Sequence, residues 1–432
     1  MRSFTCKDIS PKELDAFSAQ SPWGNFQQSS GMGRVREKNG IEVSCLGFYE
    51  GDTLVAATQL ELHRGRLSTF AEVHNGPLVD LADTELAEFV FAELKARAKA
   101  AGAAQLEITP DNVYRYRASD GVPVAAGERA AGVPAWARAG ADDAGVEELK
   151  HIGFEHDGFV LGYQAVPRWR YVKDLTGIAD EKALLATYAK NTKRNVRIAQ
   201  DNGVRVERIG REDLPTFHAI CQLSCEKQGF ENRPLSYFES LYDGLGDAAE
   251  FTIAYFDTQA HLKSWEDKRD AFQADIEHLE KSLETARTPE KVERKLNDIR
   301  KKHEASLKRI ETARAYIEEG GDLIPAAAAL FVWHPRECVY LFSGSDPKYA
   351  KFYASTAIQH RMMLECLERG VEQYNFYGID GVFDDPSDPG RGLLEFKQGF
   401  GGYVLEMMGS FTLPVKPLTY KAKQLAHKVL GR

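Results

Sequence analysis

Short hydrophobic runs bounded by turn residues recur along both halves of the chain and predict β-strands. They read IEVSCLGFY from Ile41, LVAATQLEL from Leu54, AQLEI from Ala104, FVLGYQAV from Phe159, FTIAYF from Phe251, AAAALFVW from Ala326, CVYLF from Cys338 and QYNFYG from Gln373. Between them, apolar residues recur at helical spacing over residues 84–101, 183–200, 214–228 and 353–369. Strands that alternate with helices predict an α/β architecture in which helices cover a sheet.

The segment from Thr258 to Glu318 follows a different pattern, because it has few β-branched runs and nearly half of its residues are charged. Its apolar residues form two series at heptad spacing, which predicts two helices packed along a seam. The series are Leu262, Trp265, Phe272, Ile276, Leu279 and Leu283, then Val292, Leu296, Ile299, His303, Leu307, Ile310 and Ile317. Thr288 and Pro289 suit the N-cap and first residue of the second helix. We therefore expect a helical hairpin with arms of about 29 residues, roughly 43 Å long, that projects from the protein.

Length and composition favour a two-domain cytoplasmic protein. The chain has 432 residues, against about 150 for a usual domain, so two packed domains and an accessory element are expected. A hydrophobic fraction of 43% with 28% charged residues excludes wholesale disorder. No stretch reaches the roughly 18 apolar residues of a membrane span, and the polar N-terminal segment lacks the apolar core of a signal peptide. The six cysteines are too scattered for a disulfide framework.

Charge is distributed unevenly along the chain. The sequence has 55 Lys and Arg against 64 Asp and Glu, a net charge of −9, which argues against a surface that binds nucleic acid throughout. Local basic stretches remain at residues 190–211, in the second hairpin helix and after Glu406. The first includes Lys190, Lys193, Arg194 and Arg197, and the last includes Lys416, Lys421, Lys423, Lys428 and Arg432. Each is either a solvated face or a contact for an anionic partner, and the hairpin is alternatively a rigid spacer or dimer contact.

Several catalytic signatures are absent from the sequence. It contains no GxSxG, HExxH or GxxxxGK(S/T) motif and no GxGxxG after a strand, which excludes serine hydrolases, zincins, ATPases and dinucleotide-binding enzymes. Gln28 to Gly33 reads QSSGMG and fits the QxxGxG loop with which N-acetyltransferases bind acetyl-CoA. That loop requires a preceding strand, whereas SPWGNF precedes this one.

The most informative stretch runs from Gln373 to Gly402 and reads QYNFYGIDGVFDDPSDPGRGLLEFKQGFGG. It begins as a buried strand, passes through an acidic turn and ends where Lys397 is flanked by Phe396, Phe400 and three glycines. Glycines let a backbone approach a ligand closely, and a lysine among aromatic residues is a point charge suited to an anion or a developing oxyanion. The stretch is either such a site or a structural glycine corner.

The residues of this stretch resemble the FemABX family of aminoacyl-tRNA-dependent peptidyltransferases, which build the interpeptide bridges of peptidoglycan. The resemblance covers nearly the whole chain in six ordered blocks. They are SPWGNFQQSSGMGRVRE from Ser21, GPLVD from Gly76, KNTKRNVRIAQDNGV from Lys190, ENRPLSYF from Glu231, VYLFSGSDPKYAKFYA from Val339, and YNFYGIDG to FKQGFGG from Tyr374. The inserted hairpin is similar to the arm of the longer, tRNA-using members.

This resemblance implies an α/β fold of two N-acetyltransferase-like (GNAT) domains with an inserted antiparallel coiled-coil arm. Residues 1–165, completed by 405–432, would form the first domain, and residues 166–404 the second, with the arm at 258–318. The acceptor, a lipid II-like or UDP-linked muramyl peptide, would bind in the cleft between the domains. The protein would transfer an amino acid from aminoacyl-tRNA to an amine of that precursor. It would work in the cytoplasm, with its basic end at the inner face of the membrane.

The resemblance also implies roles for individual residues. Arg36, Arg233 and Lys397 fall where family members contact the acceptor phosphates, and Tyr349 and Tyr353 lie in the neighbouring acceptor-binding segment. Phe396 and Lys397 occupy positions associated with the carbonyl or the tRNA end. The basic residues Lys190, Lys193, Arg194 and Arg197 are the expected tRNA contacts.

The expected general base departs from the family pattern. Family members often carry Asp-Pro after the strand that matches LEITP, whereas here Thr109 precedes Pro110. Asp111 is either the substitute base or a turn residue after proline. The implied reaction is aminolysis of an ester that is already activated, so we expect no ATP loop, cofactor or metal. Two alternatives stay open: a CoA-dependent N-acyltransferase on the same fold, and a non-catalytic coiled-coil scaffold.

Overall fold

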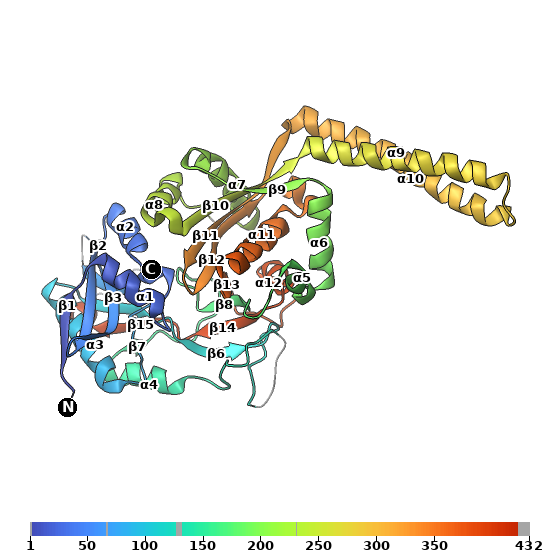
Figure 1. The fold of residues 1–432 in the computed structure, drawn as a ribbon. Coiled ribbons are helices and arrows are strands. Elements are labelled where there is room, and N and C mark those ends of the chain that lie inside the picture. Colours follow the sequence, from blue (N-terminus) through green and yellow to red (C-terminus); the bar gives the residue numbers. More distant parts are fainter. Residues whose placement is uncertain (1, 66–67, 127–131, 230, 422–432) are drawn as a thin grey trace.

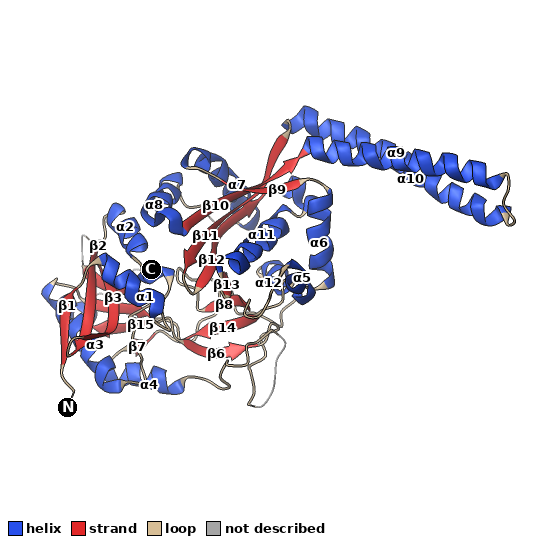
Figure 2. Cartoon of the chain, viewed as in Figure 1, coloured by secondary structure: helices blue, strands red, loops and turns tan. Residues whose placement is uncertain are grey.

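The computed structural model describes residues 2–65, 68–126, 132–229 and 231–421. In this part of the chain the strands form a seven-stranded and an eight-stranded sheet, both covered by helices (Figures 1 and 2). In spatial order, the first sheet is β1 (Phe4–Asp8), β2 (Glu42–Glu50), β3 (Thr53–Arg64), β4 (Thr69–His74), β5 (Gln105–Thr109), β15 (Phe411–Pro414) and β7 (Glu155–His156). The second is β6 (Val113–Arg117), β14 (Tyr403–Met407), β8 (Trp169–Asp174), β13 (Gln373–Ile379), β12 (Glu337–Ser345), β11 (Leu323–His334), β10 (Ala249–Asp257) and β9 (Val204–Arg208).

The two sheets repeat one topology. Each begins with four antiparallel strands, β1 to β4 in one sheet and β9 to β12 in the other. Each continues with a parallel pair, β4–β5 or β12–β13, whose crossover contains a helix, as parallel strands require. The crossover helices are α3 (Thr84–Ala100) and α11 (Ala354–Arg369). The predicted α/β architecture of two similar halves is therefore confirmed.

Helices cover both faces of the eight-stranded sheet. Alternate residues of β11 point to opposite faces, so Phe331 joins one buried cluster and Leu330 and Val332 join another. One face packs on α5 (Glu181–Thr187), α6 (Lys190–Asp201), α11 and α12 (Arg391–Gln398), and the other on α2 (Ser30–Lys38), α7 (Leu214–Gln228) and α8 (Leu235–Leu245). The other α-helices of the described residues are α1 (Pro11–Gln20), α4 (Asp143–Ile152), α9 (Thr258–Leu283) and α10 (Pro289–Gly320). No helix in the described ranges has the length and apolar character that crossing a bilayer requires.

The chain passes from one sheet to the other more than once. Strand β6 directly follows β5 in sequence but lies at the edge of the second sheet, where it pairs with β14. Strand β14 lies inside the second sheet and β15, only a few residues later, lies inside the first. The boundary proposed between residues 404 and 405 therefore falls within β14, and the division into 1–165 and 166–404 remains a proposal.

The helices α9 and α10 form the long projecting arm of Figure 1 and lie antiparallel, side by side. The second helix begins at Pro289 with Thr288 as its N-cap, as expected. The buried seam of the outer half consists of Ile276, Leu279, Leu296 and Ile299.

The seam of α10 differs from the predicted series near the base of the arm. Its buried positions are Ser306, Ile310 and Ala313, whereas Leu307 is 43% exposed. These positions continue the alternating steps of three and four from Leu296 and Ile299, as a regular heptad requires. The hydrophobicity of Leu307 predicts that it lies in the seam, but the small residues Ser306 and Ala313 are buried there instead and allow close helix packing.

Two other predicted elements also differ from the structure. The run FVLGYQAV is not a strand, because Gly158 and Gly162 adopt left-handed φ values of +91° and +93°, and the strand β8 follows it instead. The helix predicted over residues 183–200 is divided into α5 and α6, since Tyr188 and Ala189 are extended between them. The helices predicted over residues 84–101 and 214–228 are confirmed.

Candidate active site

Lys397 lies near the end of α12 and its side chain points into the protein. Only 3% of the residue is exposed, and its Nζ donates hydrogen bonds to the carbonyls of Phe376 at 2.8 Å and Gly378 at 2.6 Å. These carbonyls flank Tyr377, whose φ of +62° interrupts the pairing of β13 with β8. Burial lowers the pKa of Lys397 to about 7, and the nearby Asp380 carboxylate opposes this shift only in part.

The predicted aromatic surroundings of Lys397 are present. The ring of Phe400 lies 5.4 Å from the rings of both Phe376 and Phe396, and Phe400 is fully buried. Phe396 itself is partly buried against the same cluster. The lysine is therefore held by backbone carbonyls in apolar surroundings, where electrostatic interactions are stronger than in water.

Asp111 lies on the connection between the two sheets and forms an ion pair with a residue that sequence reasoning missed. Its Oδ1 accepts hydrogen bonds from Arg170 Nη1 at 2.7 Å and Asn75 Nδ2 at 3.0 Å. Arg170 is 3% exposed, pairs across the sheet with Gly378, and its guanidinium lies 5.8 Å from the ring of Tyr377. The structure thus brings Asp111 and Lys397 to the two sides of the same interruption in β13.

A second buried carboxyl group faces this region. Glu337 of β12 is 7% exposed, and its Oε2 accepts a hydrogen bond from Asn375 Nδ2 at 2.7 Å. Burial raises its pKa to about 7, and the neighbouring Asp111 carboxylate contributes to this shift. A carboxyl group that titrates near neutrality is suited to proton transfer. Its sequence neighbours, Arg336 and Cys338, gave no signal of this role.

Arg36 of α2 is buried, and its guanidinium contacts three other side chains. Its Nε lies 2.9 Å from Glu61 Oε1, and its Nη atoms donate to the side chains of Gln59 and Gln27 and to the Gln27 carbonyl. Only 5% of Arg36 is exposed. In this conformation Arg36 acts as a buried ion-pair partner, so its expected contact with an acceptor phosphate stays a prediction.

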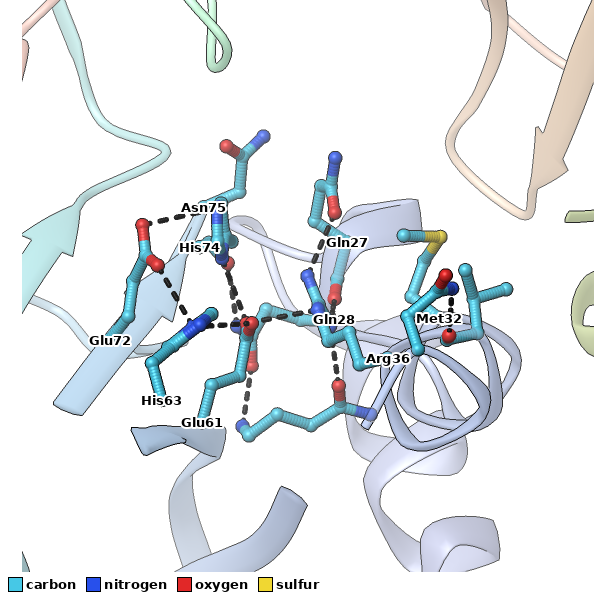
Figure 3. Close-up of polar contacts among 12 residues, drawn as sticks. Gln27, Gln28, Met32, Arg36, Glu61, His63, Glu72, His74 and Asn75 are labelled. Carbon is cyan, nitrogen blue, oxygen red and sulfur yellow. Dashed lines mark hydrogen bonds and ion pairs between the residues drawn. The ribbon is translucent and has the colours of Figure 1, made fainter. Parts of the chain in front are cut away.

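Histidines surround the carboxylate with which Arg36 pairs (Figure 3). His74 Nδ1 lies 2.9 Å from Glu61 Oε1, and both His74 and His63 also contact Glu72 at 3.1 Å. Burial opposes ionisation of Glu61, but hydrogen bonds from the histidines and the charge of Arg36 outweigh it and lower its pKa to about 2. Hydrogen bonds to Glu61 and Glu72 raise the pKa of His63 to about 9.

The same cluster contains the atoms of a possible metal site. One ligand atom each from Glu61, Glu72 and His74 lie within 4.8 Å of one another. In the structure these groups bind one another, and Arg36 supplies the positive charge that a cation would bring. The expectation of no metal stays a prediction.

Arg233 is exposed, in contrast to Arg36, and the two approach a common tyrosine. The Arg233 guanidinium lies 5.5 Å from the ring of Tyr237 on α8. Burial raises the pKa of Tyr237, and the charges of Arg233 and Arg36 oppose that shift. Helix α8 approaches α2 closely where Gly244 faces Val35. A Cβ atom on residue 244 would lie only 2.4 Å from Val35 Cγ2, so glycine is required at this contact. Tyr237 therefore lies close to both the exposed Arg233 and the buried Arg36.

The predicted acceptor residues Tyr349 and Tyr353 lie elsewhere, at the base of the arm. Tyr349 is 5% exposed and its ring packs against Phe256 and Tyr316. Tyr353 has a φ of +54°, is the N-cap of α11 and lines a cavity beside α6. The structure therefore groups these two tyrosines with the arm.

The predicted tRNA contacts Lys190, Lys193, Arg194 and Arg197 are all exposed on α6. The buried residues Thr192, Val196 and Ala199 alternate with them at helical spacing and pack the opposite side of α6 against the protein. Of the four basic residues, Arg194 also lines the cavity at the base of the arm.

Comparisons with known proteins cover almost the entire chain. The model of the FemAB family matches residues 9–428. The aminoacyltransferase FemA of Staphylococcus aureus strain N315 is 27% identical, over 98% of this chain and 99% of its own length, and that of strain MW2 is equally similar. A crystal structure of FemX aligns with a TM-score of 0.78 at 23% identity, over 97% of this chain and 99% of its own.

Proposed function

The chain belongs to the FemAB family and is an aminoacyltransferase, and on this premise we propose that it transfers an amino acid from aminoacyl-tRNA to a peptidoglycan precursor. The acceptor would be an amine of the stem or bridge peptide, on a lipid II-like or UDP-linked muramyl peptide. Transfer would extend the interpeptide bridge. The observation that carries this proposal is a cluster of cations and carboxyl groups at the junction of the two sheets. The cations are Arg36, Arg170, Arg233 and Lys397, and the carboxyl groups are those of Asp111 and Glu337.

The proposed reaction needs no external energy source. The acceptor amine attacks the ester carbonyl, so that a C–N bond forms and the C–O bond to the tRNA ribose breaks. The amine loses a proton and the ribose oxygen gains one, which leaves the overall reaction balanced. Alignment of the reactants and stabilisation of the carbonyl oxygen are the main requirements.

The described contacts suggest how these requirements are met. A lysine ammonium has three donors, and Lys397 uses two of them on backbone carbonyls, which leaves one for a phosphate or carbonyl oxygen. Arg233 is exposed and free to meet the acceptor, with Tyr237 beside it. Asp111 and Glu337 are our candidates for the proton acceptor, because both carboxyl groups face Arg170 and Tyr377.

The substrates can be tested directly with the full-length protein. Lipid-linked or UDP-linked precursor is incubated with a pool of charged tRNAs, with and without ribonuclease, and the product mass is measured. We expect a mass gain of one amino-acid residue that ribonuclease abolishes. Transfer from acetyl-CoA without RNA would instead support a CoA-dependent N-acyltransferase, and unchanged mass of every acceptor would contradict the proposal.

We also propose peripheral contact with the inner face of the membrane through the basic C-terminal residues. Lys416 Nζ donates to the Gly102 carbonyl and Lys421 follows in the described chain, whereas Lys423, Lys428 and Arg432 lie outside the described residues. A chain that ends after Lys421 retains β15, so it leaves the first sheet intact. We expect it to bind anionic liposomes about a hundredfold more weakly than the full chain, since it lacks three basic residues and each one near anionic lipid contributes about 1 kcal/mol. Equal sedimentation with liposomes would contradict this contact.

A further inference from the structure

A cavity of about 380 Å³ lies where the base of the arm meets α6 and the start of α11. Its volume is within the range of about 300–1,000 Å³ that is usual for small-ligand sites. The lining residues are Arg194, Ile198, Asn202, His261, Trp265, Arg309, Thr312, Tyr316, Lys351, Phe352 and Tyr353. None of them is acidic. The cavity lies between two of the basic stretches that the sequence offers as contacts for an anionic partner, residues 190–211 and the second hairpin helix.

Aromatic rings form much of the cavity wall. The rings of His261 and Trp265 lie 6.4 Å apart, and those of Tyr316 and Phe352 lie 5.7 Å apart. Flat aromatic faces stack on nucleobases regardless of base identity. The aromatic rings can stack only on an unpaired base, because neighbouring base pairs cover the faces of the bases in a duplex.

The cations around the cavity contact aromatic rings and have no carboxylate partner among the described residues. Lys268 Nζ lies 4.5 Å from the ring of Trp265, and Arg309 lies 5.9 Å from it. Lys351 lies 5.2 Å from the ring of Tyr316. The arm forms several ion pairs elsewhere, such as Arg300 with Glu280. Unpaired cations that converge on one aromatic cavity are therefore available to neutralise a phosphate.

His261 supplies an unsatisfied polar group in the same wall. It is 5% exposed, and its Nδ1 has no hydrogen-bond partner in the described protein. Burial lowers the pKa of His261 to about 4, with further contributions from Lys268, Lys351 and Arg309, so the ring is neutral near pH 7. A neutral imidazole has one donor and one acceptor nitrogen, which is suited to the edge of a nucleobase.

We propose that this cavity binds one unpaired nucleotide of the RNA substrate. The base stacks on the Trp265 side of the cavity and meets the free His261 nitrogen, while Arg194, Arg309 and Lys351 contact its phosphates. This inference rests on the proposed use of aminoacyl-tRNA and identifies where an unpaired part of that RNA is held. It also gives the arm a role at its base rather than along its length.

The test measures RNA binding separately from amino-acid transfer. The full chain and its variants are titrated with fluorescent tRNA and with a ten-nucleotide single-stranded RNA, and KM for aminoacyl-tRNA is measured in parallel. We expect Trp265→Ala to weaken binding of both RNAs about tenfold or more, the loss typical of one stacked base. Arg309→Ala removes a proposed phosphate contact and should weaken binding of both RNAs to a similar extent. Trp265→Phe keeps an aromatic face and should bind within about threefold of wild type.

The matched control is Lys308→Ala, which removes the same charge from an exposed residue that does not line the cavity. We expect it to weaken binding less than about threefold. If wild type transfers amino acids from tRNA and both cavity variants bind RNA as wild type does, the cavity proposal is wrong while the function stands. If wild type shows no transfer but single-stranded RNA binding still depends on Trp265 and Arg309, the proposed function fails and the cavity site stands.

Discussion

Replacing Lys397 with methionine is expected to lower kcat about a hundredfold while KM for aminoacyl-tRNA changes little. Methionine suits the same apolar surroundings but cannot donate a hydrogen bond to a phosphate or a developing oxyanion, and loss of one such donor commonly costs about 3 kcal/mol in the transition state. The measurement is the steady-state rate of transfer to the muramyl acceptor. A variant with wild-type kinetics would contradict this role of Lys397.

The chain offers a closely matched control in Lys173. This second lysine is also 3% exposed, and its Nζ donates to Thr187 Oγ1 and to the carbonyls of Phe400 and Gly401. All three of its donors are therefore occupied, whereas Lys397 has two observed acceptors. We expect Lys173→Met to lower stability but to change kcat less than about fivefold.

The pH dependence of stability gives an independent check on Lys397. Its pKa is about 7 in the folded protein, below the ordinary value of 10.5. Between these values the unfolded chain binds more protons, so this lysine makes the free energy of unfolding rise with pH from about 7 to about 10.5. Compared with wild type, Lys397→Met should therefore lose part of that rise, which thermal unfolding at several pH values would detect.

The largest effect on stability is expected from Arg36→Met, which leaves the Glu61 carboxylate buried without its arginine. Removing one partner of a buried ion pair commonly costs about 3–5 kcal/mol. The melting temperature should fall by roughly 10 °C, which calorimetry measures. Arg233→Ala is the control, because Arg233 is exposed and its loss should change stability by less than about 0.5 kcal/mol.

The origin of that destabilisation can be separated from simple loss of packing. Adding Glu61→Gln to Arg36→Met removes the stranded charge, so the double variant should recover part of the lost stability. The folded pKa of Glu61 is about 2, below its ordinary 4.5, so its stabilising contribution is complete above pH 4.5 and is lost as the pH falls towards 2. The difference between wild type and Arg36→Met should shrink over that interval. A difference independent of pH, with no recovery in the double variant, would contradict the ion-pair explanation.

Much of the fold could be predicted from periodicity, and the errors have physical causes. The alternation of strands and helices and the break at Pro289 are local properties that the pattern records directly. The buried Ser306 and Ala313 were missed because their burial depends on close packing against α9, which hydrophobicity does not encode. The run at Phe159 contains strand-forming residues, but two left-handed glycines prevent a regular strand.

The candidate site was predictable only in part. The glycine and aromatic neighbours of Lys397 are adjacent in sequence, so its burial in an aromatic pocket could be anticipated. Arg170, Glu337 and Tyr377 come from three different strands and gain their significance from burial and from one another's charges. Such a grouping depends on strand order, which a single sequence does not reveal. The cavity at the base of the arm likewise combines residues from four separate segments.

The position of β14 and β15 has a consequence for how this protein matures. Each is an interior strand of a different sheet, and both come from the last tenth of the sequence. During synthesis, a nascent chain that still lacks these residues has a gap in both sheets, and the edges beside each gap have unpaired backbone groups. The residues of the candidate site on either side of the junction can therefore reach their final positions only after β14 and β15 have been synthesised.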